Sequence, residues 1–325
     1  MVMTDPAEHW LRSTRVAVVV GKGGVGSSTV AAAYALAAAR EGADVLFVAV
    51  DGRPGMGPLL GGRELDQNDR ILRRIKGAGQ VRGRTIPADQ AFGDYLELRG
   101  VGGMLRRAAS AASLPMIAAA TPGLEHLLVL GKIKELERDR AADLIIVDAP
   151  PAGHAAPFLR SASGLSDVVQ SGPVRDQAVE VDAMLRDPAR CQAMIVTLPE
   201  ETPVTEAIEL ANELRGDVGL ALMPLVINAC WPERPGLSKT PAMAARSQKV
   251  TLSASAKASL ASSSVFGRKR LERQHQQIDR LGSTLGLPMV TLPRLPTPRL
   301  TLHHLGVLAD ALVVPLVEPN AEAST

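Results

Sequence analysis

The sequence contains few cysteines, which excludes two classes of small-domain scaffold. Only Cys191 and Cys230 occur among its 325 residues, and they are too far apart to form a C-x-x-C pair. The sequence therefore predicts neither a disulfide framework nor a zinc site, and no zinc is expected as a cofactor. Such cysteine usage is typical of the reducing cytoplasm, which is the expected location.

Aromatic residues and net charge are also scarce. Phe, Trp and Tyr make up 2% of the chain. The chain has 36 basic and 34 acidic residues, which gives a net charge of +2. General nucleic-acid binders have a basic surface and aromatic side chains on which bases stack. No nucleic-acid partner is therefore expected.

Long apolar runs are absent as well. No segment reaches the roughly 18 uncharged apolar residues that a membrane span needs. Asp5 and Glu8 lie where a secretion signal would carry positive charge. These observations predict a soluble protein and leave peripheral contact with a membrane surface open.

The sequence does contain a series of short apolar runs that alternate with longer helical segments. The runs are rich in Val, Ile and Leu without polar alternation, which is typical of strands covered on both faces. The alternation predicts an α/β fold, with a doubly wound, mostly parallel sheet in a single domain covering residues 1–325. The expected strands span 16–20, 44–50, 143–148, 193–198, 220–228 and 287–292, and the expected helices span 28–40, much of 64–140, 203–215, 266–285 and 301–313.

Two segments do not fit a minimal β/α unit. Residues 64–140 predict a helical insert within the domain, and residues 231–265, rich in Pro, Ser, Ala and Lys, predict a mobile loop. Apolar residues of the insert either form ordinary helical core or line a groove for an apolar protein client. These residues are Met104, Leu105, Leu114, Met116 and Ile117.

The segment GKGGVGSST, residues 21–29, has the glycine spacing of a phosphate-binding loop and lies between an expected strand and helix. In G-x-x-x-x-G-K-[ST], backbone N–H groups surround the phosphates, the lysine contacts the outer phosphate oxygens and the hydroxyl binds Mg²⁺. Ser28 occupies the Mg²⁺ position, but Ser27 replaces the lysine. The alternative is a plain glycine-rich turn, but it does not explain why the segment lies between an expected strand and an expected helix. The residues predicted to bind ATP or ADP are Gly21, Gly23, Gly24, Val25, Gly26, Ser27, Ser28 and Thr29.

Two carboxylates follow apolar runs at the expected ends of strands. Asp51 and Asp148 can each bind Mg²⁺ or its water shell there, or can instead cap the following turn. We predict both as catalytic residues and, with Ser28, as ligands of Mg²⁺.

A lysine directly after the first glycine, Lys22, gives the loop a resemblance to the deviant phosphate-binding loop GKGGxGK[ST]. The proteins with this loop include MinD, ParA, the nitrogenase iron protein and the ArsA type. DLIIVDAPPAGH, residues 143–154, resembles the ArsA-type signature D-T-A-P-T-G-H, and VAVDGRPG, residues 48–55, resembles that family's first switch. The chain from about residue 14 to residue 312 therefore resembles ArsA-type P-loop ATPases, a family that includes arsenite pumps and tail-anchored-protein targeting factors.

The resemblance implies roles for further residues. Asn228, at the end of VIN, matches the asparagine that contacts adenine, and Pro293 matches a residue that lines the base pocket. Lys22 matches the lysine that reaches the partner's phosphates in dimers, so a homodimer or a heterodimer with an ArsA-like paralogue is implied. His154 either relays the switch motion or is simply solvated.

Two departures from the family pattern predict weakened hydrolysis. Ser27 removes the lysine, and loss of one charge-assisted phosphate contact costs about 1.5–3 kcal/mol. Pro58 stands where the family has a catalytic Asp that orients the attacking water. Three functions stay open: a slow ATPase switch, a non-hydrolysing partner of a complete paralogue, and an adaptor that holds apolar protein segments.

Overall fold

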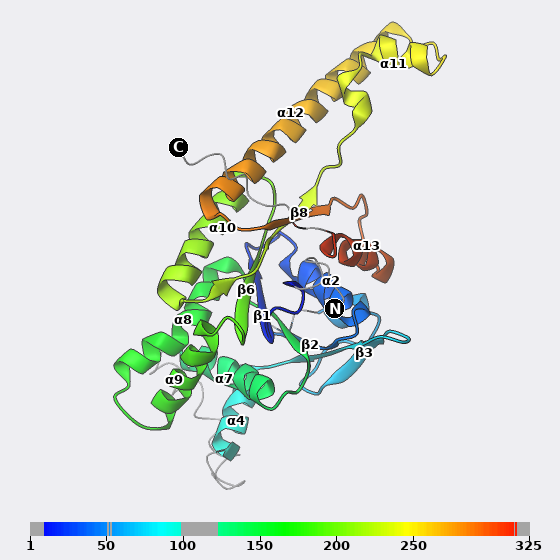
Figure 1. Ribbon diagram of the computed structural model, residues 1–325. Helices are drawn as coiled ribbons and strands as arrows, with labels where there is room; N and C mark the ends of the chain where they lie inside the picture. The colour runs from blue at the N-terminus through cyan, green and yellow to red at the C-terminus, as the bar shows by residue number, and fades with distance from the viewer. Residues whose placement is uncertain (1–9, 51, 53, 99–122, 315, 317–325) are drawn as a thin grey trace, which may run out of the picture.

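A nine-stranded sheet forms the centre of the computed structural model, which describes residues 10–50, 52, 54–98, 123–314 and 316 (Figure 1). The strand order is β3-β4-β2-β5-β1-β6-β8-β9, and β7 pairs with β6 outside this path. All pairs are parallel except β3 with β4, which confirms the expected α/β class. The strands are β1 Val16–Gly21, β2 Asp44–Ala49, β3 Arg70–Arg74, β4 Gln80–Thr85, β5 Leu144–Asp148, β6 Cys191–Thr197, β7 Ala221–Leu222, β8 Leu225–Cys230 and β9 Met289–Pro293.

Helices cover both faces of this sheet. Helices α2 and α13 pack on one face, and α7, α8, α9 and α10 pack on the other. The described helices are α2 Ser27–Arg40, α3 Met56–Leu59, α4 Ala88–Leu98, α7 Leu124–Arg138, α8 Ala152–Val168, α9 Pro173–Arg186, α10 Glu201–Glu213, the π-helix η1 Leu214–Val218, the 3-10 helix η2 Pro235–Ser238, α11 Pro241–Ser247, α12 Ala254–Leu285 and α13 Leu302–Leu312.

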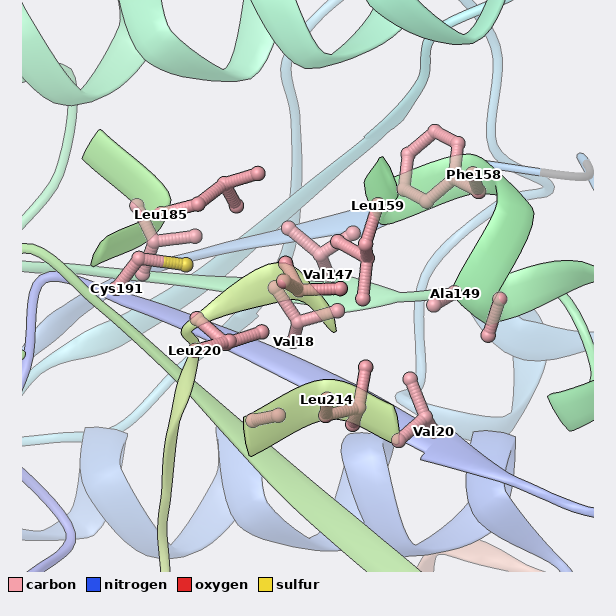
Figure 2. Close-up of a cluster of buried hydrophobic side chains, with 14 of the residues drawn as sticks. Val18, Val20, Val147, Ala149, Phe158, Leu159, Leu185, Cys191, Leu214 and Leu220 are labelled. Atoms are coloured by element: carbon pink, nitrogen blue, oxygen red, sulfur yellow. The ribbon is translucent and has the colours of Figure 1, made fainter. Parts of the chain in front are cut away.

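The side chains of β1 alternate between the two faces of the sheet. Val18 and Val20 join the cluster that includes Val147 and the α8 residue Leu159, as Figure 2 shows, whereas Ala17 and Val19 pack with α2 on the other face. Every residue of β1 is buried. A strand covered on both faces needs apolar residues at successive positions, so the run VAVVV predicted this strand correctly.

Part of the expected helical insert is wrong. Strands β3 and β4 occupy residues 70–74 and 80–85 as an antiparallel pair at the sheet edge. Their arginines hid them from an apolar-run criterion: Arg82 is paired with Asp44 and Asp69, and is therefore accommodated in a strand. Helical structure in this segment begins with α4. The apolar insert residues 104–117 lie outside the described residues.

The segment 231–265, expected to be a loop, is also different. It contains η2, α11 and the beginning of α12, which starts at Ala254 rather than at residue 266. Ser253 caps α12 by accepting a hydrogen bond from the N–H of Ala256 (3.1 Å), and Thr240 caps α11 in the same way from Met243. Serine and threonine are favoured caps, and the alanines that follow favour helix, so local propensity explains the result.

The outer half of α12 extends away from the body and carries α11 at its far end (Figure 1). The buried residues of α12 all belong to its inner half, from Gln274 to Leu285. Only that half is anchored in the core.

Candidate functional site

The glycine-rich loop joins the carboxyl end of β1 to the first turn of α2. Gly26 has φ 87°, a left-handed conformation that favours glycine, and a Cβ there would lie 2.5 Å from Nδ2 of Asn228. A Cβ at Gly21 would lie 2.6 Å from the carbonyl oxygen of Val196 on the neighbouring strand β6. A Cβ at Gly23 would meet nothing within 4 Å. The loop is therefore closely packed on the protein side and open on the other.

The N-terminus of α2 points into this loop. Helix α2 begins at Ser27 after Gly26, and Gly26 supplies no side-chain cap. The first N–H groups of a helix have no intrahelical acceptor and carry partial positive charge, which makes them donors to an anion. Eleven of the 14 residues of α2 are buried, so packing fixes the direction in which these groups point.

The hydroxyl of Ser28 lies against the carboxylate at the end of β5. Its Oγ donates a hydrogen bond to Oδ1 of Asp148 over 3.0 Å, and the Asp148 residue is only 4% exposed. The parallel register of β1 and β5 aligns Val19 with Asp148, which brings the two strand ends together. The two described residues predicted as Mg²⁺ ligands therefore lie side by side.

A hydroxyl and a carboxylate oxygen suit a hard cation such as Mg²⁺. Among the described residues, no group of three or more His, Cys, Asp and Glu side chains could enclose a metal ion. Mg²⁺ commonly retains several waters and completes its shell with phosphate oxygens. The donors present therefore fit a cation that arrives with a nucleotide. Asp51, the other predicted ligand, lies outside the described residues.

Asn228, at the end of β8, holds the loop from the other side. Its Nδ2 donates to the carbonyl oxygen of Val25 (2.8 Å), and its Oδ1 accepts from the N–H of Ala229 (2.8 Å). Pro293 ends the adjacent strand β9 and is half-buried. The two residues predicted for the base pocket therefore lie, like the loop, at the carboxyl ends of the strands.

Lys22 is paired within its own chain. Its Nζ contacts Oε1 of Glu206 on α10, and both side chains are partly exposed. The other oxygen of Glu206, Oε2, is buried with no hydrogen-bond partner among the described residues. Glu206 was not expected in the site, because the 184 residues between it and Lys22 leave no local signal in the sequence.

Next to Asn228, the chain continues into a second group of contacts that the sequence did not predict. Trp231 lies between two guanidinium groups, with Cζ of Arg270 4.4 Å and Cζ of Arg294 4.7 Å from its ring centre. Arg270 belongs to the basic run RKRLER, residues 268–273, in α12. It also pairs with Glu200 at the start of α10 (3.6 Å).

Two other residues singled out in the sequence are exposed to solvent. His154 lies in the first turn of α8 and is exposed, and Pro58 lies exposed in α3. The N-terminus of α3 is occupied by a carboxylate of the chain itself, since Glu64 accepts hydrogen bonds from the N–H of Gly55 at 3.0 and 2.9 Å.

A buried thiol also lies beside the site. Burial raises the pKa of the Cys230 thiol to about 11. Cys230 stands between Asn228 and Trp231, so its reactivity reports on the packing of this edge.

Comparison with known proteins agrees with this geometry. Residues 14–69, which include the loop, β1, α2 and β2, match the family described as anion-transporting ATPase. The chain is 35% identical over 231 residues to ATPase BagA of Mycobacterium tuberculosis, and the match covers 68% of this chain and 67% of that protein. It is 26% identical over 208 residues to the arsenical pump-driving ATPase of Escherichia coli, covering 61% of this chain and 32% of that protein.

The described part of the chain contains no helix long and apolar enough to cross a membrane. The phosphate-binding loop, the Ser28–Asp148 pair and the extent of the similarity together assign the protein: the chain belongs to the ArsA-type family of anion-transporting P-loop ATPases.

Proposed function

We propose that the chain binds ATP or ADP with Mg²⁺ in the cytoplasm and, acting alone, hydrolyses ATP slowly. The observation that supports this proposal is the hydrogen bond from Ser28 to Asp148 beside the open N-terminus of α2. These groups would hold the phosphates and the cation. Ser27 supplies no charge to the phosphates, which weakens binding, and Pro58 supplies no carboxylate to orient water, which lowers the rate.

The substitution Ser27→Lys tests this assignment. Isothermal titration with MgATP and MgADP should show about 10–100-fold tighter binding than in the unchanged chain, because one charge-assisted phosphate contact is restored. Ser28→Ala is the matched comparison, and its binding should lose its dependence on Mg²⁺. Unchanged affinity in Ser27→Lys, with an unchanged melting temperature, would contradict a binding site that is otherwise assembled.

The second part of the proposal concerns Lys22. In a homodimer, or in a heterodimer with a complete ArsA-like paralogue, Lys22 would leave Glu206 and contact the partner's phosphates, where a cation stabilises the charge of the transition state. The chain keeps Lys22 but has Ser27 and Pro58 in its own site, and this combination supports a role of Lys22 at the partner's nucleotide.

Mixing experiments test the role of Lys22. Adding the chain to a lysine-bearing paralogue from the same organism should raise ATP turnover, and Lys22→Ala should abolish the increase, while Lys76→Ala, an exposed lysine of the β3–β4 turn, should not. An increase that survives Lys22→Ala would exclude transfer of the lysine. Robust turnover by the chain alone, lost in Lys22→Ala without any partner, would also contradict the proposal.

A non-hydrolysing adaptor is the second candidate function, and Ser27 with Pro58 favours it. Such a protein would hold apolar segments of a client through residues 104–117. Replacing Met104, Leu105 and Met116 by Ser should then abolish capture of an apolar helical peptide without changing nucleotide affinity. Capture that is unaffected by these changes would exclude this function.

A further inference from the structure

Basic residues are concentrated in one continuous segment of the chain. We name residues 234–271 the arm: it contains η2, α11 and the outer half of α12. The arm has no acidic residue, whereas the remainder of the chain contains 28 basic and 34 acidic residues. The near-neutral chain therefore consists of an arm of +8 and a remainder of −6. The eight basic residues of the arm are Arg234, Lys239, Arg246, Lys249, Lys257, Arg268, Lys269 and Arg270.

The arm is presented to solvent. It extends from the body at one corner, with α11 at its outer end (Figure 1). Within the arm, η2 packs on α12: Arg268 donates to the carbonyl oxygen of Leu237 (2.8 Å), and Gly267 lets the side chain of Leu237 approach closely. The packing that holds α12 in the core starts only at Gln274.

The outer end of the arm combines apolar and cationic side chains. We name residues 241–257 the tip. Met243 and Val250 there are 57% and 55% exposed. Arg246, Lys249 and Lys257 are exposed in the same segment, and no described carboxylate lies within ion-pair distance of these three. Half of the large apolar residues recorded as exposed in the described chain belong to the arm, which is unusual for a surface that faces only water.

These properties select an anionic lipid surface over other anionic partners. Cations are attracted to phosphate groups of lipids, and neighbouring apolar side chains gain by entering the boundary between headgroups and acyl chains. A nucleic acid would reward the cations but not Met243 and Val250, and the tip contains no aromatic residue on which a base could stack. The exposed apolar residues Leu260, Val265 and Phe266 point to different sides of α12, so contact through the tip fits better than a helix lying flat.

We propose that the tip of the arm docks the protein on membranes rich in anionic lipids, with Met243 and Val250 entering the headgroup region and Arg246, Lys249 and Lys257 contacting lipid phosphates. The proposal is independent of nucleotide binding, since none of these residues belongs to the loop site.

Flotation with vesicles tests the docking. The full chain should bind vesicles of phosphatidylcholine with about 30% phosphatidylglycerol, and not vesicles of phosphatidylcholine alone, since the surface potential comes from anionic lipid. Binding should fall steeply in 0.5 M NaCl. The variant R246E/K249E/K257E should bind on the order of 100-fold less, at about fivefold per cation lost.

Two further variants separate the causes. K76E/R280E/R299E has the same net charge as the arm variant but changes exposed residues outside the arm, and it should bind as the unchanged chain does. M243S/V250S keeps all the cations and should bind several-fold less because it loses the apolar contribution. Circular dichroism shows whether each variant retains its helices.

Several outcomes would overturn the proposal. They are equal binding to both vesicle types, equal loss in the two charge-reversed variants, and full binding by M243S/V250S. Binding of a double-stranded oligonucleotide, together with no binding to anionic vesicles, would assign the arm to nucleic acid instead.

Discussion

The position of Gly26 sets two conditions that no amino acid with a side chain can meet together. Its φ of 87° strains residues with a side chain, and the space for a Cβ is occupied by Nδ2 of Asn228 at 2.5 Å. A side chain here would either move the loop or break the hydrogen bond from Asn228 to Val25. The loop conformation therefore depends on a residue that contributes no functional group.

The substitution Gly26→Ala should destabilise the protein by about 1–3 kcal/mol, the cost of a strained left-handed residue, and should abolish nucleotide binding. Urea unfolding and titration with MgATP measure the two effects. Gly164→Ala is the control, because Gly164 lies exposed in α8 with nothing within 4 Å of an added Cβ, and alanine there should be neutral or stabilising by up to about 1 kcal/mol. Equal effects from both substitutions would contradict the role of Gly26.

Cys230 offers a second residue-scale prediction. Since burial raises its pKa from 9.0 to about 11, the thiolate fraction at pH 8 is about 100-fold below that of a free thiol. Labelling by a thiol reagent at pH 8 should therefore be slow in the folded protein and fast in urea. In the folded protein the rate should rise with pH up to about 11, as the thiolate forms. Fast labelling of native Cys230 at pH 8 would show that this edge of the sheet opens. Cys191 serves as an internal comparison, since burial raises its pKa to about 12.

The sequence singled out the candidate site residues that local patterns mark, and their roles stay predictions. The spacing of Gly21, Gly26 and Ser28 and the strand-end position of Asp148 are local features, and the structure brings Ser28 and Asp148 together. Glu206 and Gln274 could not be predicted, since their partners lie 184 and 43 positions away in the sequence. The predicted roles of Lys22 in a dimer and of Asn228 at adenine stay predictions.

At the level of elements, Gln274 joins α12 to the end of β8. Its Oε1 accepts from the N–H of Trp231 (2.8 Å), and its Nε2 donates to the Trp231 carbonyl oxygen (3.2 Å). The side chain thus replaces a strand partner for this residue. Because Gln274 is buried, its hydrogen bonds cannot easily be exchanged for bonds to water.

Gln274→Ala should cost about 1–3 kcal/mol in the free energy of unfolding, since it leaves partly buried backbone groups of Trp231 without this partner. Hydrogen exchange should also become faster at the Trp231 amide. Gln276→Ala, an exposed change two residues further along the same helix, should alter neither quantity. Equal stability of the two variants would show that Trp231 and Arg270 hold the helix without Gln274.

Elements differ in how well the sequence predicts them. Buried parallel strands such as β1 and β5 are continuous apolar runs and were predicted correctly. Strand β4, next to the edge strand β3, contains Arg82 and Arg84, which pair with Asp44 and Asp69, contacts that no local pattern reveals. The serine-rich beginning of α12 resembles a linker in composition, yet its cap at Ser253 and its alanines are sufficient for a helix.

For the whole molecule, net charge is a poor description of the surface. The net charge of +2 is the sum of a basic arm and an acidic remainder, so the near balance of charge holds only for the chain as a whole. Association with a charged surface responds to the local field rather than to the sum.

Ion-exchange chromatography measures this difference directly. At pH 7 and low salt the chain should bind a cation exchanger despite its small net charge. R246E/K249E/K257E should elute at much lower salt than K76E/R280E/R299E, although the two variants have equal net charge. Coincident elution of the two variants would mean that the charges of the arm do not act as one patch.

The outer half of α12 also has a mechanical consequence. From Gln274 back to Ala254, a length of about 30 Å at 1.5 Å per residue, the helix has no buried residue other than Gln274. A tilt of about 10° at its base would carry the far end through about 5 Å, by the geometry of a rigid rod of that length. At its base the helix is bonded to Trp231, three residues beyond Asn228, which is bonded to the phosphate-binding loop. A small displacement of the loop that tilted the base of this helix would therefore move its outer end by several times that distance.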